Sequence, residues 1–151
     1  MKEVVTVAFV CLHGSAKSLI AAEHMDRLAK VRGIALTATT SGPEPDAEVP
    51  ANVIEGLLKH RIDVRDRIPA RVTGEALARA IHIVSFGCDL EGLVGAQRPV
   101  EHWDDCPAVS DDFDIAYAFI NGRVELLFDR LYADNAFPRE ASVVAAAANG
   151  P

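Results

Sequence analysis

The sequence predicts a single α/β domain of three layers, α/β/α, in which helices cover both faces of a four-stranded parallel sheet. Strand-like and helix-like hydrophobic patterns alternate along the 151 residues in the order β-α-β-α-α-β-β-α, which favours parallel strands joined by crossover helices. The first strand-like run is apolar at nearly every position, as is typical of a strand buried on both faces. We expect residues 1–132 to form the domain and residues 133–151 to form a poorly ordered tail, because the periodic pattern ends there.

The first part of the chain predicts a strand over residues 4–10, a helix over residues 18–32 and a second strand over residues 34–40. Gly33 is well placed to end the helix, because glycine readily adopts the left-handed conformation that follows many helices. The helix carries its apolar residues on one side, namely Ala21, Ala22, Met25, Leu28 and Ala29.

The middle of the chain begins with Gly-Pro-Glu-Pro at residues 42–45, which excludes regular structure there. Residues 51–60 then predict a second helix. Thr73 is a suitable N-cap for a short third helix over residues 74–79.

The last part predicts strands over residues 81–86 and 99–103, followed by the longest helix. We expect Ser110 to cap this helix, with Asp111 and Asp112 stabilised near its positive end. Apolar residues spaced by three and four form one core-facing stripe, namely Phe113, Tyr117, Ile120, Val124, Leu127 and Leu131.

The composition excludes several classes of protein. Fifteen Lys and Arg against 22 Asp and Glu give a net charge of −7, which argues against binding nucleic acid or anionic membranes through bulk positive charge. No apolar run is long enough to span a bilayer, and the N-terminus is better explained as a strand than as a signal peptide. An odd number of cysteines, three, favours a cytoplasmic location. The histidines show no ligand spacing, so we expect no metal.

The segment that joins the first strand to the first helix, residues 11–18 (the Cys11 loop), predicts an oxyanion site. Backbone N–H groups in a tight loop before a helix attract negative charge, Gly14 permits a positive φ, and Lys17 adds a full charge. The same field would stabilise the thiolate of Cys11 and make it a nucleophile, with Ser18 as a hydrogen-bond donor to the sulfur. The predicted oxyanion-binding residues are Leu12, His13, Gly14, Ser15, Ala16, Lys17 and Ser18.

Other candidate residues follow the later strands. Cys88 comes after the third strand, and Asp104, Asp105 and Cys106 follow the fourth. Because ligands of such sheets bind beyond the carboxyl ends of the strands, we expect these residues to lie near Cys11.

Three segments together resemble one enzyme family. VAFVCLHGSAKS resembles the signature loop of the low-molecular-weight protein tyrosine phosphatases and arsenate reductases, which is a Cys, five residues, an Arg and a Ser after the first strand. Gly87-Cys88-Asp89 resembles the segment that carries a second redox cysteine in arsenate reductases. EHWDDCPAV, residues 101–109 (the acid loop), resembles the loop that supplies an aspartate as general acid. The resemblance spans residues 4 to 131.

The resemblance implies a flavodoxin-like topology with strand order 2-1-3-4 and a reaction that begins with attack by Cys11. It implies Asp105, or else Asp104, as the general acid, and either a redox or a packing role for Cys88. The Cys-x-His opening at His13 is more similar to arsenate reductases. No bound cofactor is implied, but a reductase would need a thiol donor, which is either a small-molecule thiol or a glutaredoxin-like or thioredoxin-like partner.

Lys17 stands where the family pattern has Arg. Lysine keeps the positive charge but lacks the planar fork that holds two oxygens of a tetrahedral anion. Three functions therefore remain open. They are reduction of arsenate, hydrolysis of a phosphate monoester through a phosphocysteine, and binding of an oxyanion with weakened catalysis.

Overall fold

The computed structural model describes residues 3–95 and 98–138. Four parallel strands form one sheet in the order β2-β1-β3-β4, which confirms the predicted topology. The strands are β1 (Val5–Val10), β2 (Leu36–Ser41), β3 (His82–Ser85) and β4 (Glu101–His102). Because all four are parallel, their carboxyl ends meet at one edge of the sheet.

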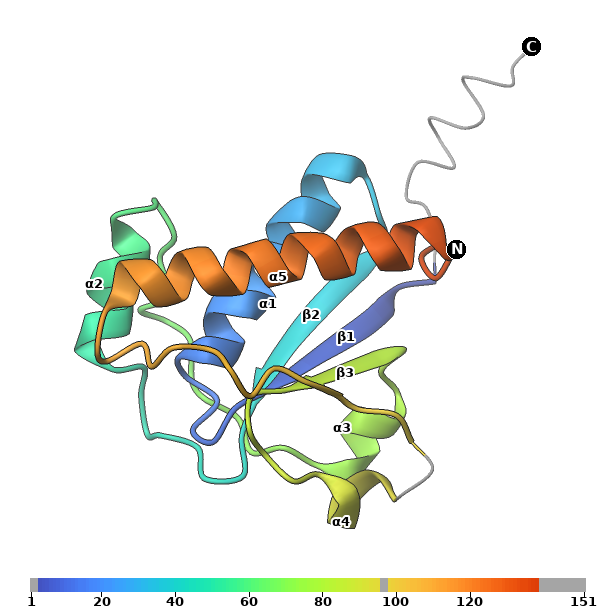
Figure 1. Cartoon of the computed structure of the whole chain (residues 1–151), viewed down its shortest axis with the longest axis horizontal. Helices are drawn as coiled ribbons and strands as arrows, with labels where there is room; N and C mark the ends of the chain where they lie inside the picture. The colour runs from blue at the N-terminus through green and yellow to red at the C-terminus, as the bar shows by residue number, and fades with distance from the viewer. Residues whose placement is uncertain (1–2, 96–97, 139–151) are drawn as a thin grey trace.

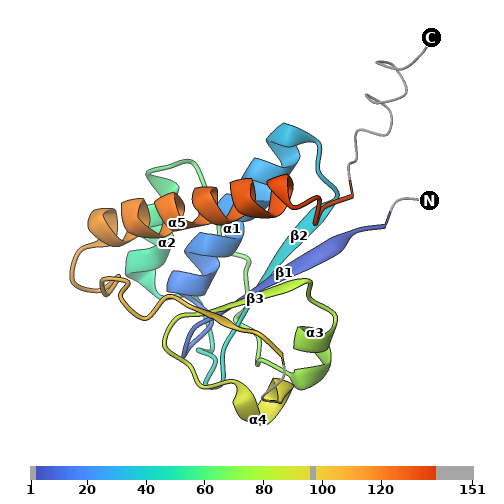
Figure 2. The same cartoon turned by 45° about the vertical axis from the view of Figure 1, so that its right-hand side comes forward.

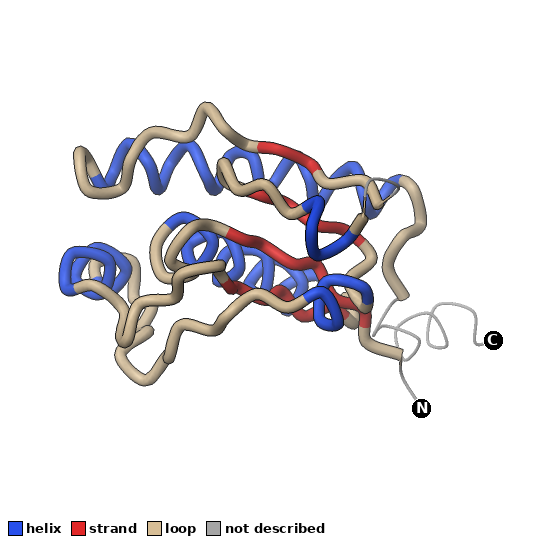
Figure 3. Tube along the Cα trace, turned by 90° about the horizontal axis from the view of Figure 1, so that it is seen from below, coloured by secondary structure: helices blue, strands red, loops and turns tan. Residues whose placement is uncertain are grey.

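The helices form two layers on opposite faces of the sheet (Figures 1 and 2). One layer contains α1 (Lys17–Arg32), α2 (Ala51–Leu58) and α5 (Phe113–Ala133). The other contains the shorter helices α3 (Gly74–Ala78) and α4 (Glu91–Val94). Figure 3 shows the molecule from the side of these short helices, with the strands between the two layers. No helix among the described residues has both the length and the apolar character that a membrane crossing requires.

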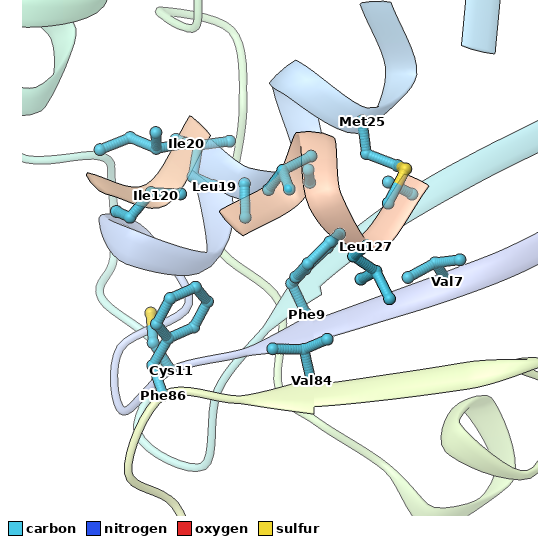
Figure 4. Packing of buried hydrophobic residues seen from close by; sticks show 14 of the residues in the cluster. Val7, Phe9, Cys11, Leu19, Ile20, Met25, Val84, Phe86, Ile120 and Leu127 are labelled. Atoms are coloured by element: carbon cyan, nitrogen blue, oxygen red, sulfur yellow. The ribbon is translucent and has the colours of Figure 1, made fainter. Parts of the chain in front are cut away.

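Strand β1 contributes to hydrophobic clusters on both faces, as its continuous apolar pattern predicts. Val7 and Phe9 face the larger cluster, which includes buried residues of α1 and α5 such as Met25 and Leu127 (Figure 4). Ala8 and Val10 belong to the smaller cluster, where they pack with Val72, Leu77, Ala80, Ile83 and Leu90. This central strand therefore fixes the position at which Cys11 leaves the sheet.

The predicted N-cap of the longest helix is wrong. The Ala108 carbonyl accepts hydrogen bonds from the backbone N–H groups of Asp111 and Asp112, at 3.2 and 3.5 Å, so Ser110 and Asp111 lie in a turn. Asp112 is the cap, and its Oδ1 accepts a hydrogen bond from the Ile115 N–H at 3.1 Å. The helix begins at Phe113 for this reason.

Two further differences concern short segments. The helix α4 has no counterpart in the elements expected from the sequence, because four residues are too few to show a helical period. The packed chain also extends past residue 132, since Phe137 is buried against Phe128 and the Pro138 carbonyl accepts a hydrogen bond from the Ala35 N–H. The remainder of the expected tail, residues 139–151, lies outside the described residues.

The Cys11 loop is locked against the segment that follows β2, residues 42–50 (the 42–50 loop). The Glu44 N–H donates to the Leu12 carbonyl at 2.9 Å, and the Asp46 N–H donates to the His13 carbonyl at 3.2 Å. Gly42 makes this approach possible, because a Cβ atom there would lie 2.3 Å from the Cys11 carbonyl oxygen. The geometry of the two loops is therefore mutually dependent.

We predict that Gly42→Ala destabilises the protein by about 2–3 kcal/mol, because the added methyl group meets backbone atoms that cannot move without separating the two loops. The matched control is Gly122→Ala on α5, where a Cβ atom would meet nothing within 4 Å. This control should stabilise the helix by about 0.5–1 kcal/mol. Urea denaturation measures both changes, and equal stability of the two variants would contradict the close packing at Gly42.

Candidate active site

Cys11 lies at the end of β1 and is buried, with 6% of its surface exposed. Its Sγ is 3.0 Å from the Ser18 Oγ and also accepts a hydrogen bond from the Ser18 N–H at 3.5 Å. The Ser18 Oγ is in turn 2.6 Å from the Thr40 Oγ1, and the Thr40 hydroxyl donates to the Gly14 carbonyl at 3.1 Å. The sulfur is thus held by a chain of hydroxyl groups that connects β2 to the Cys11 loop.

This chain of hydroxyl groups can serve both protonation states of the sulfur. When the Thr40 hydroxyl donates its hydrogen bond to the Gly14 carbonyl, the Ser18 hydroxyl can donate to Thr40 and accept from the Cys11 thiol. If instead the Ser18 hydroxyl turns to donate to a thiolate, the Thr40 hydroxyl can donate to Ser18. The network therefore supports a Cys11 thiolate at the cost of one hydrogen bond to the Gly14 carbonyl.

The backbone of the Cys11 loop leaves donors available for an anion. In the described part of the chain, the N–H groups at positions 12, 13, 15, 16 and 17 donate to no protein acceptor. The Gly14 N–H donates to the Cys11 carbonyl at 3.3 Å, and Gly14 has a φ of 62°. Lys17 begins α1, so the first N–H groups of that helix are also unpaired within it. These N–H groups remain available to an anion, and the oxyanion-binding role of the loop stays a prediction.

A cavity of about 290 Å³ contains Cys11 at its wall. Six residues of the Cys11 loop line it together with residues of the 42–50 loop, α2 and the acid loop. The lining residues are Cys11, Leu12, His13, Ser15, Ala16, Lys17, Asp46, Pro50, Asn52, Val53, Phe86, Ala108, Val109 and Ser110. Cys11 and Phe86 are drawn side by side in Figure 4. The volume is at the lower end of the range for small-molecule sites.

The structure can be compared with solved structures. Over 88% of this chain it is similar to YfkJ from Bacillus subtilis, with a TM-score of 0.77, 17% identity and 98% of that chain covered. It is similar to a thioredoxin-dependent arsenate reductase from Corynebacterium glutamicum, with a TM-score of 0.71, 21% identity, and 88% of this chain and 64% of that chain covered. A low-molecular-weight protein tyrosine phosphatase from B. subtilis gives a TM-score of 0.71 at 13% identity, over 87% of this chain and 99% of that one.

The fold is that of the low-molecular-weight phosphatases and arsenate reductases. The sequence matches no protein-family model and no curated protein. The expected strand order and layering of this fold are confirmed.

Lys17, the residue at the position of the signature Arg, lines the cavity and connects two loops. Its Nζ donates a hydrogen bond to the Cys106 carbonyl at 3.3 Å. The ammonium group therefore joins the start of α1 to the acid loop while remaining at the cavity wall.

The structure does not bring Asp104 or Asp105 to the cavity. The Asp105 carboxylate is 2.6 Å from the guanidinium of Arg123 on α5, and 63% of its side chain is exposed. The Asp104 carboxylate lies 3.9 Å from the His102 ring and is also exposed. Neither residue lines the cavity, so their assignment as general acid stays a prediction.

All three cysteines are free thiols. Burial raises the pKa of the Cys88 thiol, and the negative charge of Cys11 nearby raises it further. Burial also raises the pKa of Cys106, although Lys17 opposes this effect. Cys88 is fixed by Ser85, whose hydroxyl donates to its carbonyl at 2.8 Å and accepts from its N–H at 2.9 Å. Neither thiol lines the cavity that contains Cys11.

Two residues of the site were not anticipated, Thr40 and Asp46. Both belong to the region where β2 ends, whereas the candidates that the sequence predicts follow β1, β3 and β4. The signal was available, because the carboxyl end of β2 meets the same edge of the sheet. No group of three or more His, Cys, Asp or Glu side chains within residues 3–95 and 98–138 could hold a metal ion.

We predict that Cys11 reacts faster with iodoacetamide than Cys88 or Cys106 at pH 6 to 7 and that inorganic phosphate slows this reaction. The loop N–H groups and Lys17 lie at the same cavity as Cys11, and the Ser18 hydroxyl contacts its sulfur, whereas the pKa values of the other two thiols are raised. Mass spectrometry of the labelled peptides measures the three rates. Faster labelling of Cys88, or labelling of Cys11 that phosphate does not slow, would exclude Cys11 as the nucleophile at an anion site.

Proposed function

We propose that the protein is a cysteine-dependent enzyme that acts on a tetrahedral oxyanion and resembles arsenate reductases in its reaction. The observation that carries this proposal is the Cys11 thiol, which is hydrogen-bonded to Ser18 beside a cavity lined by unpaired loop N–H groups and Lys17. Similar structures support it, since they include an arsenate reductase in the phosphate-binding state and a protein in complex with benzylphosphonate.

In the reductase reaction the Cys11 thiolate attacks arsenic, the S–As bond forms, and one arsenic–oxygen bond breaks as the oxygen leaves with a proton. The loop N–H groups and Lys17 balance the charge on the remaining oxygens. A second thiol then attacks the Cys11 sulfur. The S–S bond forms as the S–As bond breaks, and the electron pair of the S–As bond stays on arsenic. Oxidation of the two thiols to a disulfide thus reduces As(V) to As(III), and arsenite leaves.

The thiol donor in this proposal comes from outside the cavity. Cys88 does not line it, and its raised pKa disfavours the attacking thiolate at neutral pH. A small-molecule thiol or a glutaredoxin-like or thioredoxin-like partner avoids both constraints. The similarity to a thioredoxin-dependent arsenate reductase supports a partner of the last kind.

The test is arsenate reduction by the whole chain with three thiol systems in parallel: a small-molecule thiol, glutaredoxin with glutathione, and thioredoxin with its reductase. Arsenite is measured directly, and Cys11→Ser is the control that removes the nucleophile. We expect reduction with at least one system and none in the control. Failure with all three would exclude the reductase reaction.

A phosphatase is the second candidate, and the absence of a second thiol from the lining of the Cys11 cavity favours it. Cys11 would form a phosphocysteine that water hydrolyses, so no thiol donor is consumed. Release of phosphate from an aryl phosphate in the absence of added thiol distinguishes this reaction from reduction.

A third candidate is an oxyanion-binding protein without useful turnover, which the hydrogen bond of Lys17 to the Cys106 carbonyl favours. The Lys17 ammonium group, which also donates a hydrogen bond to the acid loop, would bind the oxyanion as a point charge and could not hold two of its oxygens at once. Thermal stabilisation by phosphate or arsenate, with neither reduction nor hydrolysis, would identify this function.

We predict that Lys17→Arg increases the rate of aryl phosphate hydrolysis by about 10- to 100-fold, because the guanidinium can hold two oxygens of the transition state. Initial rates with a saturating aryl phosphate measure the change, and circular dichroism checks the fold. The matched control is Lys30→Arg, which makes the same change near the other end of α1. An unchanged rate in Lys17→Arg would show that lysine at this position does not limit turnover.

A further inference from the structure

The proposed reactions need a proton for the oxygen that leaves, and the cavity that contains Cys11 offers a source other than the acid loop. Asp46 is the one carboxylate among its lining residues within the described chain. Asp104 and Asp105 are exposed and face His102 and Arg123 instead. The proton donor is therefore better sought on the 42–50 loop.

Asp46 is held firmly against the Cys11 loop. Its N–H donates to the His13 carbonyl at 3.2 Å, and its Oδ2 accepts a hydrogen bond from the Ser15 hydroxyl at 2.6 Å. Ser15 is almost fully buried, with 1% exposed. The carboxyl group is consequently fixed both by its backbone and by its side chain, at the wall of the cavity that contains Cys11.

Within the described chain, the titratable side chains that line this cavity with Asp46 all belong to the Cys11 loop. His13 lies on the Cys11 loop, with its Nδ1 3.8 Å from the Asp46 Oδ1, and Lys17 and Cys11 line the same cavity. The His13 Nδ1 is also 2.8 Å from the Glu44 carbonyl, which can only accept, so this nitrogen carries a hydrogen and donates it. His13 therefore cannot take a proton from Asp46 at Nδ1.

An oxyanion bound at the Cys11 loop would place a second negative charge beside Asp46. Two acidic groups that share a small site are rarely both ionised, because a proton held between the carboxyl group and the oxyanion removes the repulsion of their charges. Binding of the substrate itself would then load Asp46 with the proton that the reaction uses. A carboxylate at this place would otherwise only weaken the binding of an anion.

We propose that Asp46 is the general acid and base of this site, a catalytic residue for the reaction proposed above. As the bond from the Cys11 sulfur to phosphorus or arsenic forms and the bond to the leaving oxygen breaks, the Asp46 carboxylic acid gives its proton to that oxygen. In the phosphatase reaction the resulting carboxylate then takes a proton from the water that hydrolyses the phosphocysteine. The inference rests on the proposed function, because it needs the oxyanion to bind over Cys11.

The test compares hydrolysis of two aryl phosphates by the full chain, one with a poor leaving group (phenyl phosphate) and one with a good leaving group (2,4-dinitrophenyl phosphate). A general acid matters for the first and little for the second. We expect Asp46→Asn to reduce kcat/KM for phenyl phosphate by about 100-fold and for the dinitrophenyl ester by less than about threefold.

Asp105→Asn and Asp104→Asn are the matched controls, and both should change the two substrates equally. In the Asp46→Asn variant the amide oxygen of the new side chain can still accept the Ser15 hydrogen bond. An unchanged rate of Cys11 alkylation with unchanged protection by phosphate would show that the loop is intact in this variant. The proposal would be overturned in favour of the acid loop if Asp105→Asn reduced kcat/KM for phenyl phosphate more than for the dinitrophenyl ester and Asp46→Asn did not.

Two further outcomes separate this inference from the proposed function. If phosphate protects Cys11 but the wild-type protein hydrolyses neither ester, Asp46 is not a general acid of ester hydrolysis although the oxyanion site stands. If phosphate does not protect Cys11 at all, the oxyanion site itself is wrong, and the assignment of Asp46 falls with it.

Discussion

The site depends on the close approach of two backbone segments, the Cys11 loop and the 42–50 loop. Gly42 lets them meet where any side chain would collide with the Cys11 carbonyl, and two hydrogen bonds from the 42–50 loop then occupy the Leu12 and His13 carbonyls. With the Leu12 carbonyl turned toward the 42–50 loop, the N–H group of the same peptide, that of His13, remains for an anion, whereas the Gly14 N–H donates to the Cys11 carbonyl. The chemistry of Cys11 is therefore set by a neighbour that is distant in sequence and adjacent in the parallel sheet.

The same contact explains the uneven charge of the cavity. The Cys11 loop supplies unpaired N–H groups and Lys17, whereas the 42–50 loop supplies the Asp46 carboxylate opposite Ser15. An arginine in place of Lys17 could hold two oxyanion oxygens with its guanidinium group. Lysine has a single ammonium group, and this group already donates a hydrogen bond to the Cys106 carbonyl. In such a site the placement of a proton matters more, because fewer donors balance the charge of the transition state.

The elements that could be predicted from the sequence are those with a clear period. The strand β1 and the helix α5 were anticipated because a continuous apolar run and a stripe spaced by three and four leave few alternatives. The cap of α5 was predicted wrongly because Ser110, Asp111 and Asp112 can all accept an N-terminal N–H, and only the turn at Ala108 decides among them. The sequence does not indicate Asp46, because a run with two prolines predicts only a break in structure. Its position at the cavity comes from pairing with a loop 31 residues earlier.

The two remaining cysteines show how burial limits a redox interpretation. A thiol that resolves an adduct on Cys11 must attack as a thiolate, and burial opposes the ionisation of both Cys88 and Cys106. The negative charge of a Cys11 thiolate raises the pKa of Cys88 further. Once Cys11 has formed an adduct and lost its negative charge, it no longer raises the pKa of Cys88, but burial still does. A thiol that arrives from solvent, already ionised, avoids this penalty, and for this reason the site is better suited to an external reductant than to an internal disulfide relay.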